Sequence, residues 1–499
     1  MKFYSLLAIV LYLLILLVIG YYSYRKTNNI SDYMIGGRSL GPMVTALSAG
    51  ASDMSGWMLM GLPGAVYATG ISSIWLSVGL TIGAYFNYRL LAPRFRIYTE
   101  VASDSLTVPD YLENRFKDNS KMLRIVSGII ILVFFTLYVS SGIVAGGKLF
   151  RDLFGFTYTS GVVVTLSIVV IYTYFGGFLA VTLTDFFQGS LMFIVLVIVP
   201  IVAYTNLGID PGTFVNKVKH IDPALFDVLR GTSLSTIIGF LAWGLGYFGQ
   251  PHIIVRFMAI KSAKELKSAR RIGIGWMTIG LLGSMASGLI GLVYFTSISQ
   301  PLKDPEMVFL RLGDVLFHPF VTGIILSAVL AAIMSTISSQ LLVCSSSITK
   351  DFYLTFLNKE ATEKTQMFVG RISVLIIAAF AVIFAYVPNK TILNIVGQAW
   401  AGFGSAFGPM LLLSLYWKRM TKWGALSGMV VGGLTVIIWI LTGLSAHLYE
   451  MIPGFSLSLI AVIVGSLLTK QPDESVICEF KTMEKNLIDI TKARSEEHT

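Results

Sequence analysis

The sequence predicts an all-α, polytopic membrane protein with about 13 transmembrane helices, and three observations support that fold class. The 499 residues are 55% hydrophobic and only 13% charged, and the mean hydropathy of +0.75 is far above that of a typical soluble chain. Apolar runs of about 20 residues, the length of a membrane-spanning helix, recur along the whole chain. Two of these runs are interrupted by glycine, proline and polar residues, which predicts two broken helices.

The first apolar run extends from Phe3 to Tyr24. It is longer than the apolar region of a signal peptide, so we expect it to be retained as a span. The other expected spans are 39–66, 71–92, 125–147, 160–180, 186–206, 232–256, 273–297, 317–347, 371–388, 391–416, 423–444 and 454–469. An odd number of spans places the two termini on opposite sides of the membrane.

These spans divide the chain into five predicted parts. They are a first helix with an inner loop (1–38), a first repeat of five spans (39–206), an outer loop with a second repeat (207–416), two additional helices (417–470) and a cytoplasmic tail (471–499). Each repeat begins with an interrupted span, which is the spacing that an inverted five-plus-five repeat requires. The alternative is that the glycines in these spans only allow close helix packing.

The distribution of basic residues predicts the orientation. With the N-terminus outside, 23 of the 37 Lys and Arg residues lie in inner loops and span ends, the tail adds five, and nine lie outside. The positive-inside rule therefore favours an outer N-terminus and a cytoplasmic C-terminus. Anionic membrane lipid accounts for the formal net charge of +10, so no nucleic-acid partner is needed.

Several function classes lack support in the sequence. No nucleophile with its base, metal cluster or facing pair of acids indicates an enzyme, and the two cysteines, Cys344 and Cys478, match no metal-ligand spacing. We expect no cofactor and no obligate protein partner. A channel would need rings of carbonyls or charges along a continuous pore, whereas the polar groups in these spans converge on one point.

The interrupted spans carry the chemistry. The stretch "SAGASDMSGW" places Asp53 in the middle of the first one, where an acid costs at least about 3 kcal/mol on insertion scales. In the second, "WGLGYFGQP", Pro251 has no N–H to pair with the carbonyl of Tyr247. A free carbonyl at this depth is tolerated only where it lines a cavity or meets a ligand. Trp243 and Tyr247 are four residues apart, so we expect them on one face of the helix.

A third element, "SAVLAAIMSTISSQLL", places hydroxyls at helical spacing. Ala332, Ser335 and Thr336 are three and four residues apart, so they share one helix face. Ser335, Ser338 and Ser339 have the same spacing one turn further on. Serines in membrane helices often bond to the carbonyl one turn back. Hydroxyls beside an unwound helix also form the kind of oxygen cage that a hard monovalent cation needs.

Four stretches, "GGRSLGPMVTALSAGASDMSGWMLMGLPGAVYATGIS", "AWGLGYFGQPHIIVRFMA", "LSAVLAAIMSTISSQLLVCSS" and "AWAGFGSAFGP", resemble the sodium/solute symporter family, in particular its bacterial members that carry proline. The resemblance extends from about Asp32 to Gly465. It implies the LeuT-type fold, with one helix before and two after a ten-helix core. It also implies sodium-coupled symport of L-proline into a bacterial cell, across the cell membrane, by alternating access. The alternative is another small solute, such as a different amino acid, an organic acid or a sugar.

The same resemblance implies roles for individual residues. Sodium would bind carbonyls of Ala51, Met54 and Ala332 and hydroxyls of Ser335 and Thr336, with Asp53 as the coupling acid. The substrate would contact Ser55, Gly56, Trp57, Tyr138, Trp243 and Tyr247. A second sodium site would use Asp185, Ser335, Ser338 and Ser339, and Arg38 and Pro251 would act in gating or as a hinge. Sodium is the co-transported ligand in this scheme.

Three of these roles have alternatives. Asp53 either lowers the cost of bringing a cation to the break or accepts hydrogen bonds from the freed amides. Asp185 is otherwise a helix N-terminal acid satisfied by local amides, with Thr184 nearby. Arg38 is otherwise a residue at a helix end whose head group reaches toward water. A proton could replace sodium, although an uncharged cage of hydroxyls and carbonyls argues against it.

Overall fold

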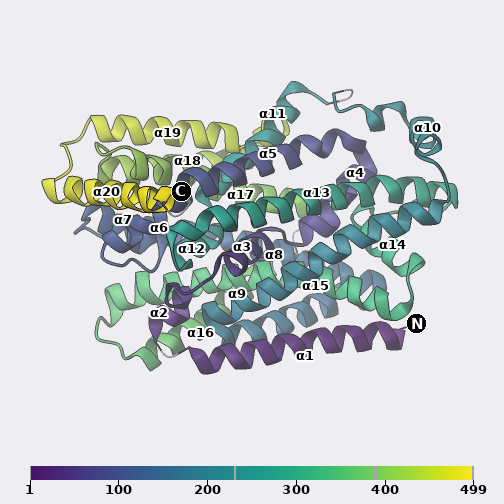
Figure 1. Ribbon diagram of the computed structural model, residues 1–499, viewed down its shortest axis with the longest axis horizontal. Coiled ribbons are helices and arrows are strands. Elements are labelled where there is room, and N and C mark those ends of the chain that lie inside the picture. The colour runs from purple at the N-terminus through teal and green to yellow at the C-terminus, as the bar shows by residue number, and fades with distance from the viewer. Residues whose placement is uncertain (1, 28, 230–231, 387–390, 497–499) are drawn as a thin grey trace.

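The computed structural model describes residues 2–27, 29–229, 232–386 and 391–496, and these residues form an all-helical bundle with no strand. Long helices lie side by side along the longest axis, and the two chain ends lie toward opposite ends of the bundle (Figure 1). Among the described residues, eight helices are long and apolar enough to cross a membrane, and three shorter apolar helices accompany them. The all-α membrane fold is confirmed, whereas the total of about 13 spans stays a prediction.

The helices of the N-terminal part are α1 Lys2–Lys26, α2 Ile30–Ile35, α3 Pro42–Asp53, α4 Leu62–Thr69, α5 Ile74–Phe86, α6 Ala92–Val101, α7 Val108–Phe116, α8 Met122–Phe154, α9 Tyr158–Leu207 and α10 Pro211–Ile221. Those of the C-terminal part are α11 Leu234–Ala242, α12 Pro251–Ala259, α13 Leu266–Ser297, α14 Val308–Leu316, α15 Pro319–Ser346, α16 Glu363–Ala385, α17 Ile392–Tyr416, α18 Lys422–Leu441, α19 Met451–Leu467 and α20 Glu474–Glu496. Ten short non-α segments accompany them among the described residues. They include η2 Trp57–Gly61, η4 Asn87–Leu91 and η9 Ser347–Leu357, which are π-helical, and η6 Trp243–Gly249, a 3₁₀ helix.

Most predicted spans coincide with these helices, with one difference. The spans predicted at 160–180 and 186–206 form the single element α9, and its direction changes at Gly177 (φ 61°, ψ −173°). Only glycine adopts this conformation readily, so the boundary lies earlier than the predicted gap between the two spans. The last two residues of the predicted span 371–388, and residues 497–499 of the predicted tail, lie outside the described residues.

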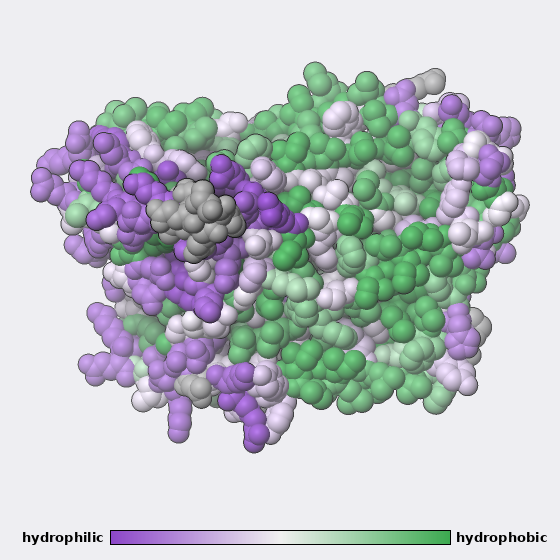
Figure 2. All heavy atoms as spheres, viewed as in Figure 1, coloured by the Kyte–Doolittle hydropathy of each residue, from purple (hydrophilic) through white to green (hydrophobic). Residues whose placement is uncertain are grey.

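The surface matches a bundle surrounded by an apolar medium. Hydrophobic residues cover the middle and right of the face in Figure 2, and hydrophilic residues gather at its left end and right margin. Large apolar side chains such as Phe380 of α16 and Ile438 of α18 are exposed. A soluble monomer rarely exposes apolar patches of this extent.

The polar C-terminal tail is helical and packs against the bundle. It forms α20, which packs against α6. Phe480 and Met483 on α20 are buried, and Glu479 forms an ion pair with Lys117. The tail therefore covers one end of the bundle.

Glycines allow the helix carrying the second break to approach its neighbours. A Cβ on Gly83 of α5 would lie 2.4 Å from Cα of Gly244 and 2.1 Å from its carbonyl oxygen. These distances are far inside van der Waals contact, so α5 and η6 touch through their backbones. Any side chain at position 83 would separate them.

We therefore expect Gly83→Ala to destabilise the protein by about 1–3 kcal/mol, the usual cost of overpacking. The apparent melting temperature of the detergent-solubilised protein measures the effect. Gly275→Ala on α13 is the control, because a Cβ there would meet nothing within 4 Å. Equal melting temperatures for the two variants would contradict the close backbone contact between Gly83 and Gly244.

Candidate functional site

The first break lies between α3 and η2. Met54 (φ −79°, ψ 71°) leaves the helical conformation directly after Asp53. The carbonyl oxygen of Asp53 accepts three hydrogen bonds, from Ser55 N (2.9 Å), Trp57 Nε1 (3.1 Å) and Tyr138 Oη (3.5 Å). Two side chains predicted for the substrate site thus hold the backbone at the break.

The second break lies between η6 and α12. Gln250 (φ −87°, ψ 103°) is extended, and Pro251 is the first residue of α12. Proline is favoured there because the first helical N–H has no partner in any case. Pro251 therefore begins the second half-helix, α12, and does not bend a continuous one.

The predicted alignment of Trp243 and Tyr247 is wrong. The segment that carries both is a 3₁₀ helix, which has three residues per turn, so residues four apart do not share a face. The indole of Trp400 from α17 contacts both: its centroid lies 6.3 Å from Trp243 in a stacked pair and 5.0 Å from Tyr247 in an edge-on pair.

Trp400 and Gln250 fasten the second break to α17. Trp400 Nε1 donates to the carbonyl of Trp243 (2.8 Å), and Gln250 Nε2 donates to the carbonyl of Trp400 (3.1 Å). A Cβ on Gly246 would lie only 2.0 Å from Trp400 Nε1. Neither Trp400 nor Gln250 was predicted as a site residue, although a tryptophan among the small residues of "AWAGFGSAFGP" was a signal for a close contact.

The predicted sodium ligands of α15 do meet the first break. Ser335 Oγ lies 2.7 Å from the carbonyl oxygen of Ala51 and 3.2 Å from that of Ala332. Thr336 Oγ1 lies 3.1 Å from the Ala332 oxygen and 3.5 Å from the Ala51 oxygen. Met54 follows at the end of α3. Both hydroxyls now donate to carbonyls, and each can rotate to present a lone pair to a cation.

The carboxyl group of Asp53 points elsewhere. Asp53 is 2% exposed; its Oδ2 accepts a hydrogen bond from Tyr247 Oη. Its Oδ1 has no hydrogen-bond partner among the described residues. The structure therefore does not show this carboxylate holding the freed amides, as the alternative role requires.

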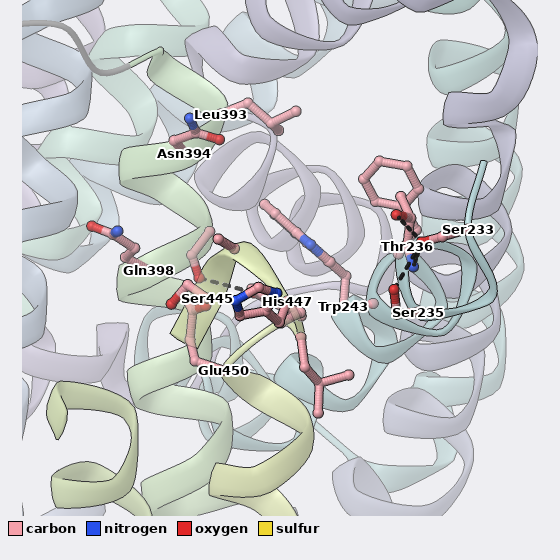
Figure 3. A pocket seen from close by; sticks show the side chains of 16 residues that line it. Ser233, Ser235, Thr236, Trp243, Leu393, Asn394, Gln398, Ser445, His447 and Glu450 are labelled. Carbon is pink, nitrogen blue, oxygen red and sulfur yellow. Dashed lines mark hydrogen bonds between the residues drawn. The ribbon is translucent and has the colours of Figure 1, made fainter. Parts of the chain in front are cut away.

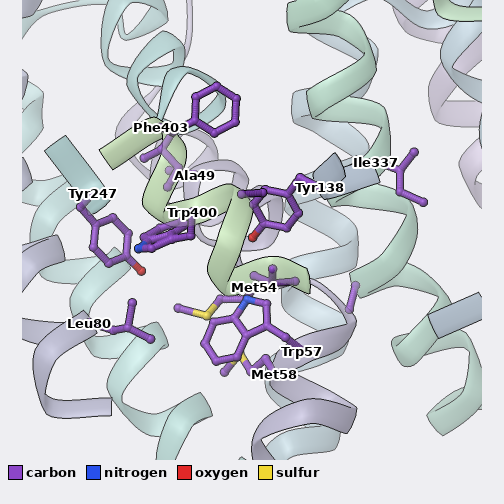
Figure 4. Close-up of a cluster of buried hydrophobic side chains, with 14 of the residues drawn as sticks. Ala49, Met54, Trp57, Met58, Leu80, Tyr138, Tyr247, Ile337, Trp400 and Phe403 are labelled. Atoms are coloured by element: carbon purple, nitrogen blue, oxygen red, sulfur yellow. The ribbon is translucent and has the colours of Figure 1, made fainter. Parts of the chain in front are cut away.

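The remaining predicted substrate residues surround the same break. A Cβ on Gly56 would lie 3.0 Å from Cβ of Ala145 on α8 and 3.4 Å from Cγ1 of Ile333 on α15, so the chain passes close to both helices. Trp57 lies with its ring centroid 6.5 Å from that of Trp243. Figure 4 shows Trp57, Tyr138, Tyr247 and Trp400 converging from different helices. The structure thus brings all six predicted substrate residues into one region.

A second polar cluster lies around Asp185, in the interior of α9. Its Oδ2 is 3.1 Å from Arg256 Nη2 and 2.8 Å from Ser48 Oγ. Ser339 Oγ lies 3.4 Å from the same oxygen and 2.5 Å from Arg256 Nη2. The interpretation of Asp185 as a helix N-terminal acid is wrong, because the second part of α9 begins after Gly177, about two turns before Asp185. Thr184 bonds to carbonyls of its own helix.

Arg256 thus stands where the second sodium ion was predicted. Asp185 and Arg256 are both completely buried, and the guanidinium bridges Asp185 to Ser339. Ser338 donates to the carbonyl of Ser335 (3.1 Å). The other carboxylate oxygen of Asp185, Oδ1, has no hydrogen-bond partner among the described residues, so a second cation at Asp185 would have to bind this oxygen beside the guanidinium.

Arg38, whose side chain is 10% exposed, is held by protein groups, one of them the exposed side chain of Asp104. It forms an ion pair with Asp104 (2.8 Å) and donates to the carbonyls of Met258 (2.8 Å) and Ser105 (3.0 Å). It therefore ties the segment before α3 to the end of α12. Whether this contact is a gate stays a prediction.

Two cavities adjoin the region. The larger, of ≈450 Å³, lies between α11, α17 and the segment before α19, and Trp243 lines it. Its size is within the range of about 300–1,000 Å³ typical of ligand pockets. Figure 3 shows Ser235, Thr236 and Gln398 around this space, with Trp243 between the two helices. The smaller, of ≈20 Å³, lies beside Asp53 and Tyr247.

An apolar helical bundle in which two interrupted helices meet, with clustered hydroxyl and carbonyl oxygens at one break and aromatic rings at both, defines a secondary transporter. The chain belongs to the sodium:solute symporter family, whose model matches residues 33–432. The prediction of a transporter, and not an enzyme, is confirmed by this membership.

The chain is similar in sequence to two named transporters and similar in fold to one solved symporter structure. The chain is 58% identical over 479 residues to the osmoregulated proline transporter OpuE of Bacillus subtilis (strain 168), covering 96% of this chain and 97% of that one. It is 55% identical over 475 residues to the sodium/proline symporter of Staphylococcus aureus (strain JH9), covering 93% and 92%. A Na⁺-coupled sialic acid symporter has the same fold, with a TM-score of 0.79 at 20% identity over 94% of this chain and 99% of that one.

The buried pair of Asp185 and Arg256 leads to a prediction for stability. Removing one partner of such a pair costs about 3–5 kcal/mol, because the other charge stays buried and unpaired. We expect Asp185→Asn and Arg256→Gln each to lower the apparent melting temperature strongly, and the double variant to lower it by less than the sum. Strictly additive losses would show that the two groups do not act as a pair.

Proposed function

We propose that this chain imports L-proline together with sodium by alternating access. The two relatives from Bacillus subtilis and Staphylococcus aureus are named as proline transporters. Their sequence identity to this chain over almost its whole length supports proline as the transported solute here. The observation that carries the proposal is the contact of Ser335 and Thr336 hydroxyls with the Ala51 carbonyl at the break in α3. We further propose a bacterial cell-membrane location, with the N-terminus outside, the C-terminus in the cytoplasm and lipid around the bundle.

The proposed sodium site consists of carbonyl oxygens of Ala51, Met54 and Ala332 and hydroxyl oxygens of Ser335 and Thr336. Neutral oxygens of this kind suit a hard monovalent cation. Binding rotates the two hydroxyls away from the Ala51 and Ala332 carbonyls, so that four oxygens now bonded to each other face the ion. Sodium thereby links α3 to α15.

The proposed solute site uses Ser55, Gly56, Trp57, Tyr138, Trp243 and Tyr247. Aromatic side chains suit proline because they can cover the apolar ring and attract the secondary ammonium group. Trp243 stacks on Tyr449, with centroids 5.6 Å apart, as well as on Trp400. Solute contact with the faces of Trp243 therefore involves a shift of these rings.

The two half-helices on the inner side are joined and would move together. Leu40 N donates to the carbonyl of Ala259 (3.1 Å), and Lys261 N donates to the carbonyl of Leu40 (2.9 Å). The segment before α3 is thus paired with the segment after α12, and Arg38 strengthens the connection. The breaks beyond these halves, with Pro251 at the start of α12, would serve as hinges.

The energetics allow uptake against a gradient. One positive charge that crosses about 100 mV releases ~2.3 kcal/mol, and a tenfold sodium gradient adds ~1.4 kcal/mol. Together these support a solute gradient of roughly 500-fold. One sodium ion per proline is therefore sufficient. A second ion at Asp185, Ser335, Ser338 and Ser339 remains an alternative.

We propose the same domain division as above, with inverted repeats over 39–206 and 207–416. Another small solute is the alternative cargo. The experiment is uptake of labelled proline by proteoliposomes with sodium imposed on one side and amino acids, organic acids and sugars as competitors. The proposal is supported if uptake of labelled proline requires sodium and if, among the competitors, only unlabelled proline reduces it. Preference for another solute overturns the proposal.

Replacing Ser335 and Thr336 together by alanine should raise the sodium concentration for half-maximal uptake by at least about tenfold, because two of five ligands are lost. Ser327→Ala is the matched control. Ser327 is a buried serine of the same helix whose hydroxyl bonds only to its own helix, at the carbonyl of Gly323 (2.8 Å). A normal sodium requirement in the double variant would mean that the site is misplaced.

The two Asp53 variants separate charge from shape. Asp53→Glu keeps the charge and should retain part of the uptake with a changed sodium requirement. Asp53→Asn keeps the shape and should lose nearly all of it, because the carboxylate holds no backbone amide at Oδ1. Sodium-dependent proline uptake, normalised to the amount of protein in the membrane, decides between an electrostatic role of Asp53 and a role in holding the backbone. Higher activity of the asparagine variant would refute the electrostatic role.

A further inference from the structure

A small cavity lies on the side of Asp53 that faces α5, α12 and α13. It encloses ≈20 Å³, about the room that a single water-sized particle needs. Asp53, Asn87, Tyr88 and Tyr247 provide its polar lining, and no residue of α15 lines it. The carboxyl group of Asp53 therefore faces a different space from the oxygens of Ser335 and Thr336.

Four polar atoms around this cavity have no partner. Asp53 Oδ1, both side-chain atoms of the Asn87 amide, and Tyr88 Oη are buried without a hydrogen bond to any described residue. Asp53 is 2%, Asn87 1% and Tyr88 7% exposed. Nearly all buried polar groups in proteins are satisfied. Three residues with orphaned atoms around one cavity indicate a ligand that the protein itself does not supply.

The local backbone and packing hold these groups in place. Asn87 begins the π-helical turn η4, and such turns often occur at functional sites. Gly273 of α13 makes room for Tyr88, because a Cβ there would lie 3.2 Å from its hydroxyl oxygen. The Tyr88 ring also packs edge-on against Phe257, with centroids 4.8 Å apart.

We propose that this cavity binds a sodium ion between Asp53 Oδ1, the amide oxygen of Asn87 and the hydroxyl oxygen of Tyr88. The three oxygens are hard ligands of the type that sodium takes. A water molecule could satisfy the hydrogen bonds but would leave the carboxylate charge unbalanced, because Oδ1 has no cationic partner among the described residues. This position is separate from the five-oxygen site, so α3 carries a cation position on each of two faces.

The inference rests on sodium-coupled transport and adds to the proposed function a place where the ion meets the charge of Asp53. Gly50 lines the cavity, and Ala51, the next residue of α3, offers its carbonyl to Ser335. An ion in the cavity therefore lies beside the ion at the break, on the same turn of α3. The five-oxygen site has no formal charge of its own, whereas the site in the cavity has the negative charge of Asp53.

Two variants and one control test the cavity. Asn87→Leu has a similar size but no polar atoms, and Tyr88→Phe removes a single hydroxyl. Tyr98→Phe is the control, since Tyr98 is another buried tyrosine whose hydroxyl has no hydrogen-bond partner, and it does not line the cavity. Purified proteins are titrated with NaCl and with LiCl, at constant ionic strength and without proline, while the apparent melting temperature is followed.

We expect Asn87→Leu to raise the half-saturating sodium concentration about tenfold, Tyr88→Phe to raise it less, and both to change the ratio of sodium to lithium affinity. Tyr98→Phe should change neither quantity. A purely structural role would lower the melting temperature in the absence of sodium and leave the ion ratio unchanged. If Asn87→Leu does not fold, Tyr88→Phe decides alone.

An unchanged sodium midpoint and ion ratio in the variants would mean that the cavity holds only water, and the proposal would be overturned. Failure of the proposed function looks different. In that case the unmodified protein itself would take up proline without sodium, or would prefer another solute, whatever the variants do.

Discussion

An interrupted helix in an apolar interior leaves backbone N–H and C=O groups that neither water nor lipid can satisfy. In this protein the first break is stabilised at the carbonyl of Asp53, which collects hydrogen bonds from Ser55, Trp57 and Tyr138. The second is stabilised at the carbonyl of Trp243, which accepts the indole N–H of Trp400. The same side chains that satisfy the backbone also line the region where a solute is proposed to bind. Structural support and recognition therefore depend on one set of residues.

The bundle contains two buried carboxylates on opposite sides of α3 that differ in charge balance. Asp185 is neutralised by Arg256 and further held by Ser48 and Ser339. Asp53 receives only the hydroxyl of Tyr247 among the described residues, and one of its oxygens has no partner. A buried charge without a partner is costly, so the charge of Asp53 is the less well compensated of the two. The Oδ1 atom of Asp185 also has no hydrogen-bond partner among the described residues, but the charge of Asp185 is balanced by Arg256, and the group is suited to joining α9 to α3, α12 and α15.

Close backbone contacts explain why the breaks can be positioned so tightly. The Gly83–Gly244 contact brings α5 against η6, and a Cβ on Gly249 would lie 2.3 Å from the carbonyl oxygen of Phe403 on α17. Membrane helices lack a strong hydrophobic drive to associate, so packing through small residues is a main source of their stability. Because α17 supplies both Trp400 and the Phe403 contact, it acts as the support for the second break.

The sequence by itself determined the all-α membrane fold, the position of both breaks, and the meeting of Ser335 and Thr336 with Ala51. Those features follow from composition, local spacing and a resemblance carried by contiguous stretches. Tertiary structure alone decided the partners of Asp185 and Arg38, the role of Trp400, and the placement of Asn87, Tyr88 and Asp53 around one cavity. Arg256 and Asp185 are 71 residues apart, and Trp400 and Trp243 are 157 apart. Local periodicity reports which residues share one helix face, whereas contacts between faces depend on how distant helices pack, and a 3₁₀ turn such as η6 changes even the local periodicity.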